Sequence, residues 1–267
     1  MVARVRRLAG QKRVGHAGTL DPLAEGVLPI LLGRATRLAD FIQSGRKTYV
    51  ATVQLGSATE TDDREGAIIA TAPVPLVSTA SIESVLSRFS GEILQTPPKY
   101  SALKVSGQRA YALARSGQHV DLTPRQVTID SLVLLDHTDT LLTTEIVCSK
   151  GTYIRALARD IAEALGTVGY MASLVRTRVG PFVLADALSL DDLASRPAED
   201  SLLSPDHAIP DAPKAHATTE DARRFGNGQP LPADGLQADC VWVYDPDGRL
   251  IGLGSADGDW LRPRLAL

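Results

Sequence analysis

The chain has 267 residues, of which 44% are hydrophobic and 22% are charged, and these proportions are typical of a globular protein with a sizeable core. At roughly 100–200 residues per domain, this length predicts one large domain, or one large and one small domain. The two cysteines form no C-x-x-C pair, so neither a disulfide scaffold nor a structural zinc site is expected. No apolar run reaches the roughly 18 residues that a membrane helix needs, and we therefore expect a cytoplasmic protein.

The net charge of −3 conceals an uneven distribution of charge. Residues 1–47 carry nine basic and three acidic side chains, whereas residues 186–247 carry four basic and thirteen acidic ones. A polyanionic partner is compatible with the acidic total, because the local field and not the sum guides a phosphate backbone. A solvated helix face followed by an acidic tail domain would explain the same distribution.

The first fifth of the chain alternates between helix and loop signals. Apolar and basic residues at helical spacing predict a helix over 2–9. Glycine and proline dominate 15–33, which predicts a long ordered loop that leads to a helix over 26–32, and a second helix is expected over 35–42. Alternating β-branched residues then predict a strand over 47–56.

The middle of the chain reads as a mixture of strands and helices. A polar acidic turn over 59–66 and a short strand over 67–70 precede a helix expected over 78–90, with Ser81 as its N-cap. The remaining expectations are a short helix over 110–116, a hairpin of strands over 126–136 and 141–148, a helix over 153–165 and a strand within 169–183.

The composition shifts to acidic residues, serine and proline near residue 186, which marks a linker with a short helix over 190–193. The last part, over 241–267, is typical of a small β-unit with a turn at 245–248. We predict domain boundaries that separate residues 1–184, a linker over 185–213 and a small unit over 214–267.

The loop G-H-A-G-T-L-D-P-L-A-E-G-V-L-P, Gly15 to Pro29, is the most informative stretch for chemistry. Its three glycines and two prolines specify a rigid, tightly turned backbone around Asp21. An aspartate before proline cannot sit in the middle of a helix, so this loop can point a carboxylate away from the scaffold. A lone Asp-Pro is also typical of a turn or an N-cap, and that alternative stays open on residue types alone.

Several further blocks accompany this loop: G-R-A-T-R (33–37), K-T-Y (47–49), P-P-K-Y-S-A-L-K (97–104), G-Q-R-A-Y (107–111), C-S-K-G-T-Y-I-R (148–155) and L-V-R-T-R-V-G-P-F (174–182). In this order and spacing, the chain closely resembles the TruB-type tRNA pseudouridine synthases over residues 2–183. The resemblance implies an α+β fold with a mixed, mainly antiparallel sheet flanked by helices, followed by a small β-rich PUA-like unit.

The resemblance also implies an isomerase that converts uridine 55 in the T-loop of tRNA to pseudouridine. By position in the motifs, Asp21 corresponds to the catalytic nucleophile, Tyr49 to the residue that stacks on the base and helps to move the C5 proton, and Arg155 to the partner of the aspartate. His16 corresponds to a histidine that inserts into the T-loop, and Leu174 to an apolar wall of the base pocket.

Three more residues within the matching motifs are expected to bind substrate: Lys47, Lys150 and Tyr153. The resemblance implies binding to the T-arm of tRNA, and we expect a monomer with no metal, no cofactor and no membrane association. Elementary chemistry agrees, since a carboxylate can attack carbon or stabilise positive charge, and an arginine fork keeps that carboxylate ionised and oriented. Taken alone, His16, Tyr49 and Arg155 would more often be a loop histidine, a packing residue and a member of an ordinary ion pair.

One departure from the family pattern is the absence, at the start of the chain, of a D-K-P-x-G-x-T-S-like strand segment. A late start codon or a lost strand would both account for it. The alternative function is therefore a non-catalytic tRNA-binding or tRNA-folding protein, and a third is a general RNA-binding module without tRNA specificity.

Overall fold

The computed structural model describes residues 1–100, 104–105, 108–109 and 122–267. These residues form two compact units, and the chain crosses between them several times. The main-sheet unit comprises 19–28 and 43–187, and the terminal unit comprises 1–18, 29–42 and 188–267. The domain boundaries expected from the sequence stay a prediction.

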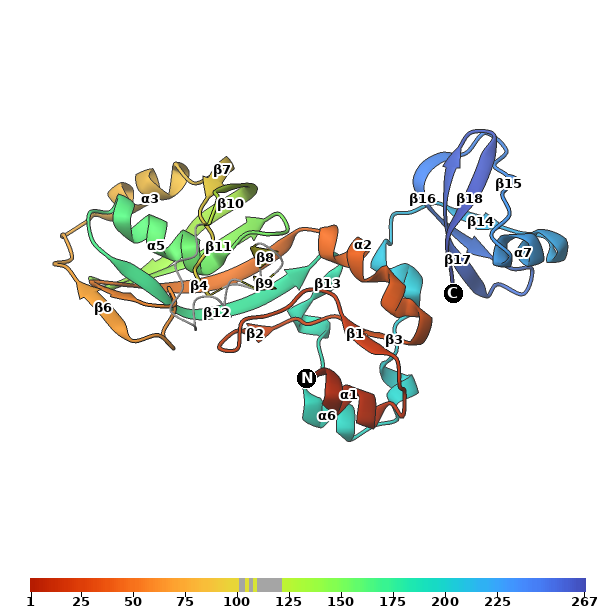
Figure 1. Ribbon diagram of the computed structural model, residues 1–267, viewed down its shortest axis with the longest axis horizontal. Helices are drawn as coiled ribbons and strands as arrows, with labels where there is room; N and C mark the ends of the chain where they lie inside the picture. The colour runs from red at the N-terminus through yellow and green to blue at the C-terminus, as the bar shows by residue number, and fades with distance from the viewer. Residues whose placement is uncertain (101–103, 106–107, 110–121) are drawn as a thin grey trace. The chain divides into compact units, whose positions relative to one another are not determined.

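A seven-stranded sheet forms the centre of the main-sheet unit (Figure 1). Its strand order is β13-β12-β4-β11-β10-β7, with every neighbouring pair antiparallel, and the short strand β2 runs parallel beside β12. The strands are β2 (Glu25–Gly26), β4 (Lys47–Leu55), β7 (Gly91–Gln95), β10 (Arg125–His137), β11 (Leu141–Cys148), β12 (Gly169–Val179) and β13 (Phe182–Val183). The expected hairpin and the mainly antiparallel sheet are thus confirmed.

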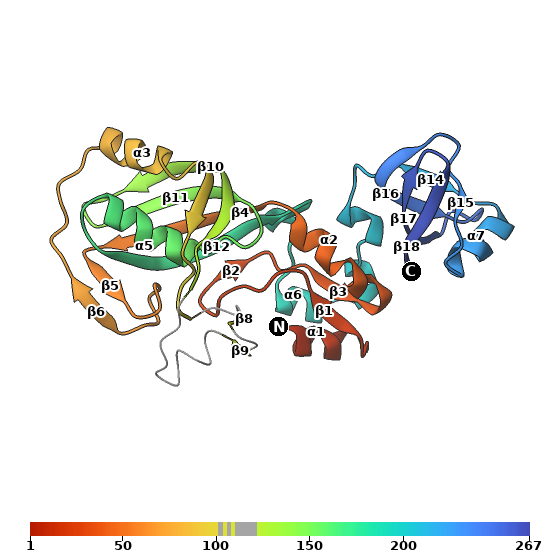
Figure 2. The ribbon, with the colours of Figure 1, turned by 45° about the horizontal axis from the view of Figure 1, so that its top comes forward.

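Two helices, α3 (Thr79–Ser87) and α5 (Ile154–Ala164), pack on this sheet and on each other (Figures 1 and 2). The helix α5 lies against β12 and β4, while α3 lies against β10. Alternate residues of β4 and β11 are buried, as expected for strands with one face in the core, and they pack with the apolar stripe of α5. The N-cap of α3 is Ser78, whose side chain accepts from Ser81 N; the expected N-cap at Ser81 was wrong.

Smaller elements complete this unit: a hairpin of β5 (Ser57–Thr59) and β6 (Ile68–Thr71), a pair of β8 (Lys104–Val105) and β9 (Gln108–Arg109), and the 3₁₀ turn η2 (Leu184–Asp186). The short helix expected over 110–116 lies outside the described residues.

The terminal unit contains a second sheet of five strands in the order β14-β16-β17-β18-β15. Helix α7 (Thr219–Gly226) packs against β18 and β15 and places Phe225 in an apolar core. The strands are β14 (Lys214–His216), β15 (Leu231–Pro232), β16 (Gln237–Tyr244), β17 (Leu250–Asp257) and β18 (Trp260–Ala266). This sheet confirms the expected β-rich C-terminal unit, although α7, β14 and β15 were not predicted.

The rest of the terminal unit is built from short elements. Helix α1 (Val2–Leu8), confirmed as expected, packs against β1 (Val14–His16) and α6 (Leu190–Ala194). The strand β1 pairs with β3 (Ile30–Leu32), followed by the 3₁₀ helix η1 (Gly33–Leu38) and α2 (Ala39–Ser44). Two 3₁₀ turns, η3 (Ala198–Ser201) and η4 (Pro205–Ala208), lie before the five-stranded sheet.

The helix expected over 26–32 was wrong. Gly26 adopts a φ of +101°, and Pro29 has no N–H to donate within a helix. The segment forms β2 and β3 instead, and Ile30 pairs with His16. Pairing with strands distant in the sequence outweighed the local apolar spacing.

Candidate active site

The loop that carries Asp21 is fixed to β12 by backbone contacts. Ala24 N donates to the Asp21 carbonyl at 2.9 Å and closes the turn, and Val27 N donates to the Arg176 carbonyl at 2.8 Å. A Cβ atom at Gly26 would lie 2.2 Å from that same carbonyl oxygen. Only glycine therefore allows the loop to approach the strand this closely.

Arg176 fastens both ends of the same loop. Its side chain is buried, and its Nε donates to the Val27 carbonyl at 2.8 Å while Nη1 donates to the Thr19 carbonyl at 3.3 Å. Asp21 lies between these two points of attachment. The sequence analysis gave Arg176 no role, although an arginine in the middle of an apolar strand pattern is a usable signal because buried charge requires specific partners.

Asp21 and Arg155 form a two-pronged ion pair. Arg155 lies in the first turn of α5, and its Nε and Nη2 donate to Oδ2 and Oδ1 of Asp21 at 3.0 and 3.1 Å. The Arg155 side chain is 7% exposed, whereas that of Asp21 is 32% exposed. The carboxylate is therefore both oriented by a fixed fork and accessible to a ligand.

The other donors of Arg155 are also occupied. Nη1 donates to the Thr61 carbonyl at 3.1 Å and lies 3.4 Å from Oδ2 of Asp63, and Nη2 donates to the Tyr100 carbonyl at 3.0 Å. Four N–H groups of this guanidinium thus donate hydrogen bonds, and its charge is balanced by two carboxylates. These contacts hold the group in one orientation and offset the cost of removing it from water.

Asp63 is a functional candidate that the sequence analysis missed. Its buried carboxylate accepts from Thr61 Oγ1 at 2.6 Å and from Glu65 N at 3.0 Å, in addition to its contact with Arg155. The sequence predicts only a polar acidic turn for this segment. Four carboxylates lie within residues 60–65, and a later helix carries two arginines one turn apart. This pattern could have indicated a shared network of ion pairs.

Tyr49 lies beside this network, on β4 opposite Arg176 of β12. Burial raises the pKa of its phenol, the nearby charge of Asp21 acts in the same direction, and Arg176 opposes the shift. Tyr49 is therefore a neutral phenol at neutral pH. The buried side chains of Leu23 and Leu174 belong to the same apolar cluster, against which Tyr49 packs.

Within the part of the chain that the structure describes, one unit thus brings together an accessible carboxylate, a fixed arginine, a neutral aromatic ring and apolar side chains. Residues 6–154 match the model of the TruB family pseudouridylate synthases (N-terminal domain), and residues 155–205 match that of the tRNA pseudouridylate synthase B C-terminal domain. The chain belongs to the TruB family.

Relatives of this TruB-family chain match it over nearly its whole length. It is 44% identical to the tRNA pseudouridine synthase B of Mycobacterium tuberculosis (strain ATCC 25618 / H37Rv), covering 98% of this chain and 89% of that protein. It is 43% identical to the protein of the same name from Gluconacetobacter diazotrophicus, covering 98% and 90%. Among solved structures, the fold is similar to a Cbf5-Nop10-Gar1 complex with a TM-score of 0.73 and 24% identity, covering 100% of this chain and 79% of that one.

The remaining predicted residues of the main-sheet unit have different surroundings. Tyr153 immediately precedes α5; its N–H donates to Oε1 of the buried Gln95 at 2.8 Å, and its carbonyl accepts from Nε2 of Gln95 at 3.1 Å. Lys150 is exposed in the turn after β11. Lys47 is buried, and its ammonium donates to the carbonyls of Gln43 and Gly45.

Burial also sets the titration of Lys47 and its neighbour across the sheet, Cys148. Desolvation lowers the pKa of Lys47 to about 8, and nearby Arg176 acts in the same direction. Desolvation raises the pKa of Cys148 to about 11, so its thiol remains protonated at neutral pH.

His16 belongs to the terminal unit, on β1 opposite Ile30. Its Nδ1 is buried and has no hydrogen-bond partner among the described residues. A buried ring nitrogen without a protein partner is unusual in a folded chain.

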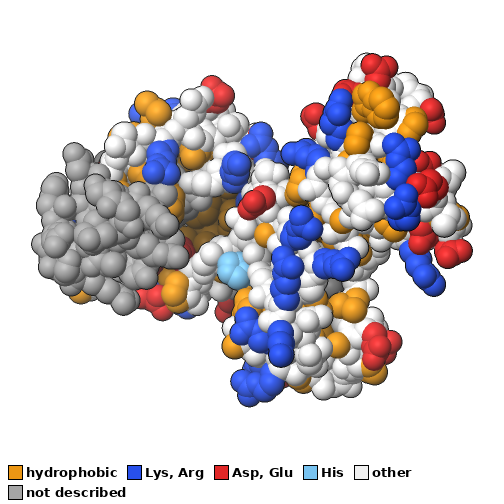
Figure 3. All heavy atoms as spheres, turned by 45° about the vertical axis from the view of Figure 1, so that its right-hand side comes forward, with side chains coloured by type: hydrophobic (Ala, Val, Ile, Leu, Met, Phe, Trp, Pro, Cys, Tyr) orange, Lys and Arg blue, Asp and Glu red, His pale blue; other side chains and the backbone are white. Residues whose placement is uncertain are grey.

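Exposed basic side chains gather in the part of the terminal unit that holds α1 (Figure 3). Arg4 pairs with Asp191 at 3.0 Å, and Arg34 and Arg37 donate to the carbonyls of Leu267 and Ala266. Among the described residues, no ion-pair partner is found for four others: Arg6, Arg7, Lys12 and Arg13.

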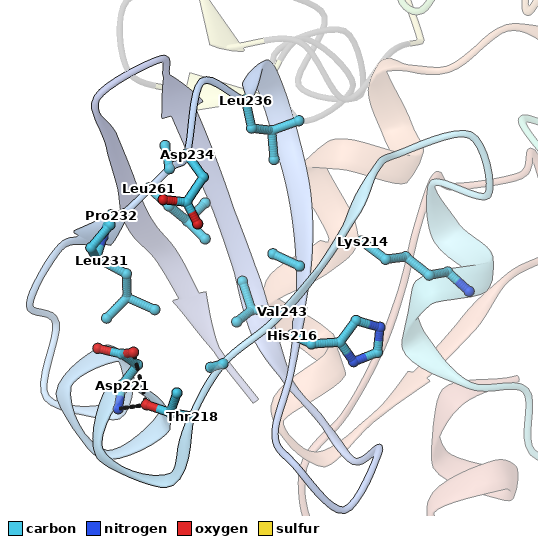
Figure 4. Close-up of a pocket in the computed structure, with 13 residues that line it drawn as sticks. Lys214, His216, Thr218, Asp221, Leu231, Pro232, Asp234, Leu236, Val243 and Leu261 are labelled. Atoms are coloured by element: carbon cyan, nitrogen blue, oxygen red, sulfur yellow. Dashed lines mark hydrogen bonds between the residues drawn. The ribbon is translucent and has the colours of Figure 1, made fainter.

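A hollow of about 440 Å³ also lies in the five-stranded part of this unit (Figure 4). Apolar side chains including Leu231 and Val243 line it, together with Asp221, which accepts from the Thr218 side chain. None of the eight predicted site residues, all of which the structure describes, lines this hollow.

The described residues contain no helix long and apolar enough to cross a membrane.

Proposed function

We propose that this TruB-family chain isomerises uridine 55 in the T-loop of tRNA to pseudouridine, with Asp21 as the catalytic carboxylate. The observation that carries the proposal is the Asp21–Arg155 pair, in which a buried arginine presents an accessible carboxylate beside an apolar wall. Relatives at 43–44% identity that are named tRNA pseudouridine synthase B support the reaction and the substrate class.

The reaction breaks the bond between C1′ of the ribose and N1 of the uracil and forms a bond between C1′ and C5. A proton leaves C5 and N1 gains one, so the product is an isomer of the substrate. Asp21 either attacks C1′ of the ribose or adds to C6 of the uracil, and an ionised, oriented carboxylate serves both routes. Arg155 holds the Asp21 carboxylate in one orientation along either route through its two hydrogen bonds.

Tyr49 and Leu174 fit the role of holding the flipped base. A neutral phenol ring is a flat surface on which uracil can stack, and the raised pKa of Tyr49 keeps that ring uncharged. A base inside a folded loop must leave its stack before a carboxylate can reach it. We also propose that His16 inserts into the T-loop at the place that the flipped base leaves, as its position in the motif implies.

Contacts to the tRNA backbone are proposed for the four exposed basic residues without ion pairs, Arg6, Arg7, Lys12 and Arg13. Their positive charge would release counterions from the backbone, so binding should weaken steeply with salt. Lys150 and Tyr153 stay proposed substrate contacts. The buried ammonium of Lys47, held by two carbonyls, favours Lys150 over Lys47 as a phosphate contact. The monomeric state and the cytoplasmic location also stay predictions from the sequence.

The test is pseudouridine formation in an unmodified tRNA transcript, mapped by position, with wild type and Asp21→Asn. We expect product at the T-loop uridine and a loss of about 10³-fold or more in the variant, with tRNA affinity retained, because the substitution removes the charge and keeps the shape. Asp257→Asn, at an exposed position of β17, is the matched control and should remain fully active.

Other outcomes would redirect the proposal. Strong turnover by Asp21→Asn would contradict the role of the carboxylate, and product at another uridine would contradict the T-loop assignment. Tight tRNA binding by the wild type with no product would favour the non-catalytic tRNA-binding alternative.

A further inference from the structure

A second arginine of α5, Arg159, lies one helical turn after Arg155. Residues four apart on a helix share a face, so both guanidinium groups point to the same side of α5. Arg159 Nη1 donates to Oδ2 of Asp62 at 2.9 Å, while Arg155 contacts the next residue, Asp63. Two arginines one helical turn apart on α5 thus contact two consecutive aspartates of one turn.

The turn that carries these aspartates has an unusual backbone conformation at Asp62. Asp62 adopts a φ of +59°, in the left-handed region that side-chain-bearing residues rarely occupy. Its carbonyl accepts from Met171 N at 3.0 Å, and Arg64 N donates to the Met171 carbonyl at 3.1 Å. The backbone of the turn is therefore attached to β12, and the side chain of Asp62 attaches it to α5.

Arg159 has further partners that fix it in place. Its Nε and Nη2 donate to Oδ1 of Asp160 at 3.0 and 2.8 Å, and Nη2 also donates to the Thr96 carbonyl at 3.1 Å. The side chains of Arg159 and Asp62 are 24% and 17% exposed. The pair is thus shielded enough from water to act as a brace and not as a loose surface contact.

We propose that the Arg159–Asp62 pair is a positioning element for the reaction: it holds the turn so that Asp63 fixes Arg155, which in turn orients Asp21. Neither member of the pair touches Asp21, and the effect passes through Asp63 and Arg155. This inference rests on the proposed role of Asp21 and adds two residues to the machinery that supports it.

The test compares Arg159→Gln, Asp62→Asn and the double variant with wild type. Asparagine keeps the shape of Asp62 and tolerates the left-handed backbone, so this variant should fold even if Arg159→Gln does not. Single-turnover rates at saturating tRNA should fall by about tenfold in each single variant, less than the roughly 10²-fold that a 1 Å misplacement can cost. The affinity for tRNA should stay within about twofold, and the double variant should be no slower than the slower single variant.

A second readout does not depend on turnover. The Nε–H of Arg155 is buried in its bond to Asp21, and its hydrogen exchange can be followed by NMR, with Arg155→Lys assigning the signal. We expect faster exchange in both single variants. Arg159→Lys keeps the charge without the fork and should be intermediate in rate and in exchange. Arg223→Gln, which breaks the exposed pair with Glu220, is the matched control and should change neither.

A rate within twofold of wild type in Asp62→Asn would overturn the inference, whatever happens to the melting temperature. A slower rate with unchanged Arg155 exchange would also overturn it, because the effect would not pass through Arg155. Failure of the Asp21 proposal would appear separately, as activity in Asp21→Asn, and the exchange measurement would still report whether the pair positions Arg155.

Discussion

The two units of this chain each contain a mainly antiparallel sheet with helix packed on it, but they differ in where their charged side chains lie. Every buried polar or charged side chain among the described residues belongs to the main-sheet unit, including Lys47, Asp63, Arg155 and Arg176. The core of the terminal unit is apolar, and its ion pairs are exposed, as Arg262–Asp257 is, or half-buried, as Arg224–Asp221 is.

This contrast separates what a sheet needs to fold from what a reaction needs. The terminal unit shows that apolar packing alone completes such a sheet, since hydrophobic burial is the main favourable contribution to folding. Buried ion pairs add little net stability, because desolvation offsets their attraction. The buried charges next to Asp21, those of Arg155 and Asp63, are therefore best explained by the chemistry proposed for Asp21.

The largest expected effect on stability comes from removing Arg155, the buried cation of the main-sheet unit. Arg155→Met would leave the carboxylate of Asp63 buried without its cation, which should lower the free energy of unfolding by about 3–5 kcal/mol in urea denaturation. Arg155→Met combined with Asp63→Asn should recover part of that loss. Arg262→Met in the terminal unit, whose partner is exposed, should leave the urea midpoint unchanged, and a loss as large as that of Arg155→Met would erase the distinction between the units.

Replacing a glycine by alanine in each unit tests whether the position of the Asp21 loop governs turnover. Gly26→Ala would put a Cβ 2.2 Å from the Arg176 carbonyl at a φ of +101°, so the Asp21 loop must move away from β12. We expect the free energy of unfolding to fall by about 1–3 kcal/mol because of backbone strain. Turnover should fall by up to roughly 10²-fold through displacement of Asp21.

The control for this test is Gly228→Ala, which has a φ of +79° and open space around the added Cβ. The added methyl group should strain the backbone but meet no neighbouring atom, and single-turnover rates should stay unchanged. Normal turnover in Gly26→Ala would show that the position of the loop does not govern the reaction.

The smallest expected effect concerns Lys47 and pH. Burial lowers its pKa from 10.5 to about 8, so between those values the unfolded chain binds more protons than the folded one, and stability rises with pH. From pH 8 to 9 this contribution should amount to about 1 kcal/mol. Lys47→Met should remove the rise, measured as the difference between urea unfolding free energies at the two pH values; an equal slope in both proteins would contradict the shift.

Some elements of the fold follow from local sequence patterns, and others do not. The strand over Lys47–Leu55 and the helix over Ile154–Ala164 were predictable, because their apolar periodicity agrees with the faces that they bury. The helix expected over 26–32 failed because pairing with β1 and β12 outweighed a short apolar run. Helix α7 was not predicted, as its single buried large side chain, Phe225, leaves little apolar pattern in a polar segment.

The sequence by itself determined the family resemblance, the mainly antiparallel fold and the candidates Asp21, Tyr49, Arg155 and Leu174, because these residues lie in motifs with fixed order and spacing. Only the tertiary structure decided which groups surround them: Asp63, Arg176 and the Arg159–Asp62 pair come from segments up to about 150 residues away in the chain. The physical reason is that a buried charge must find its partners in space, and separation along the chain does not reveal which carbonyl or carboxylate it will meet.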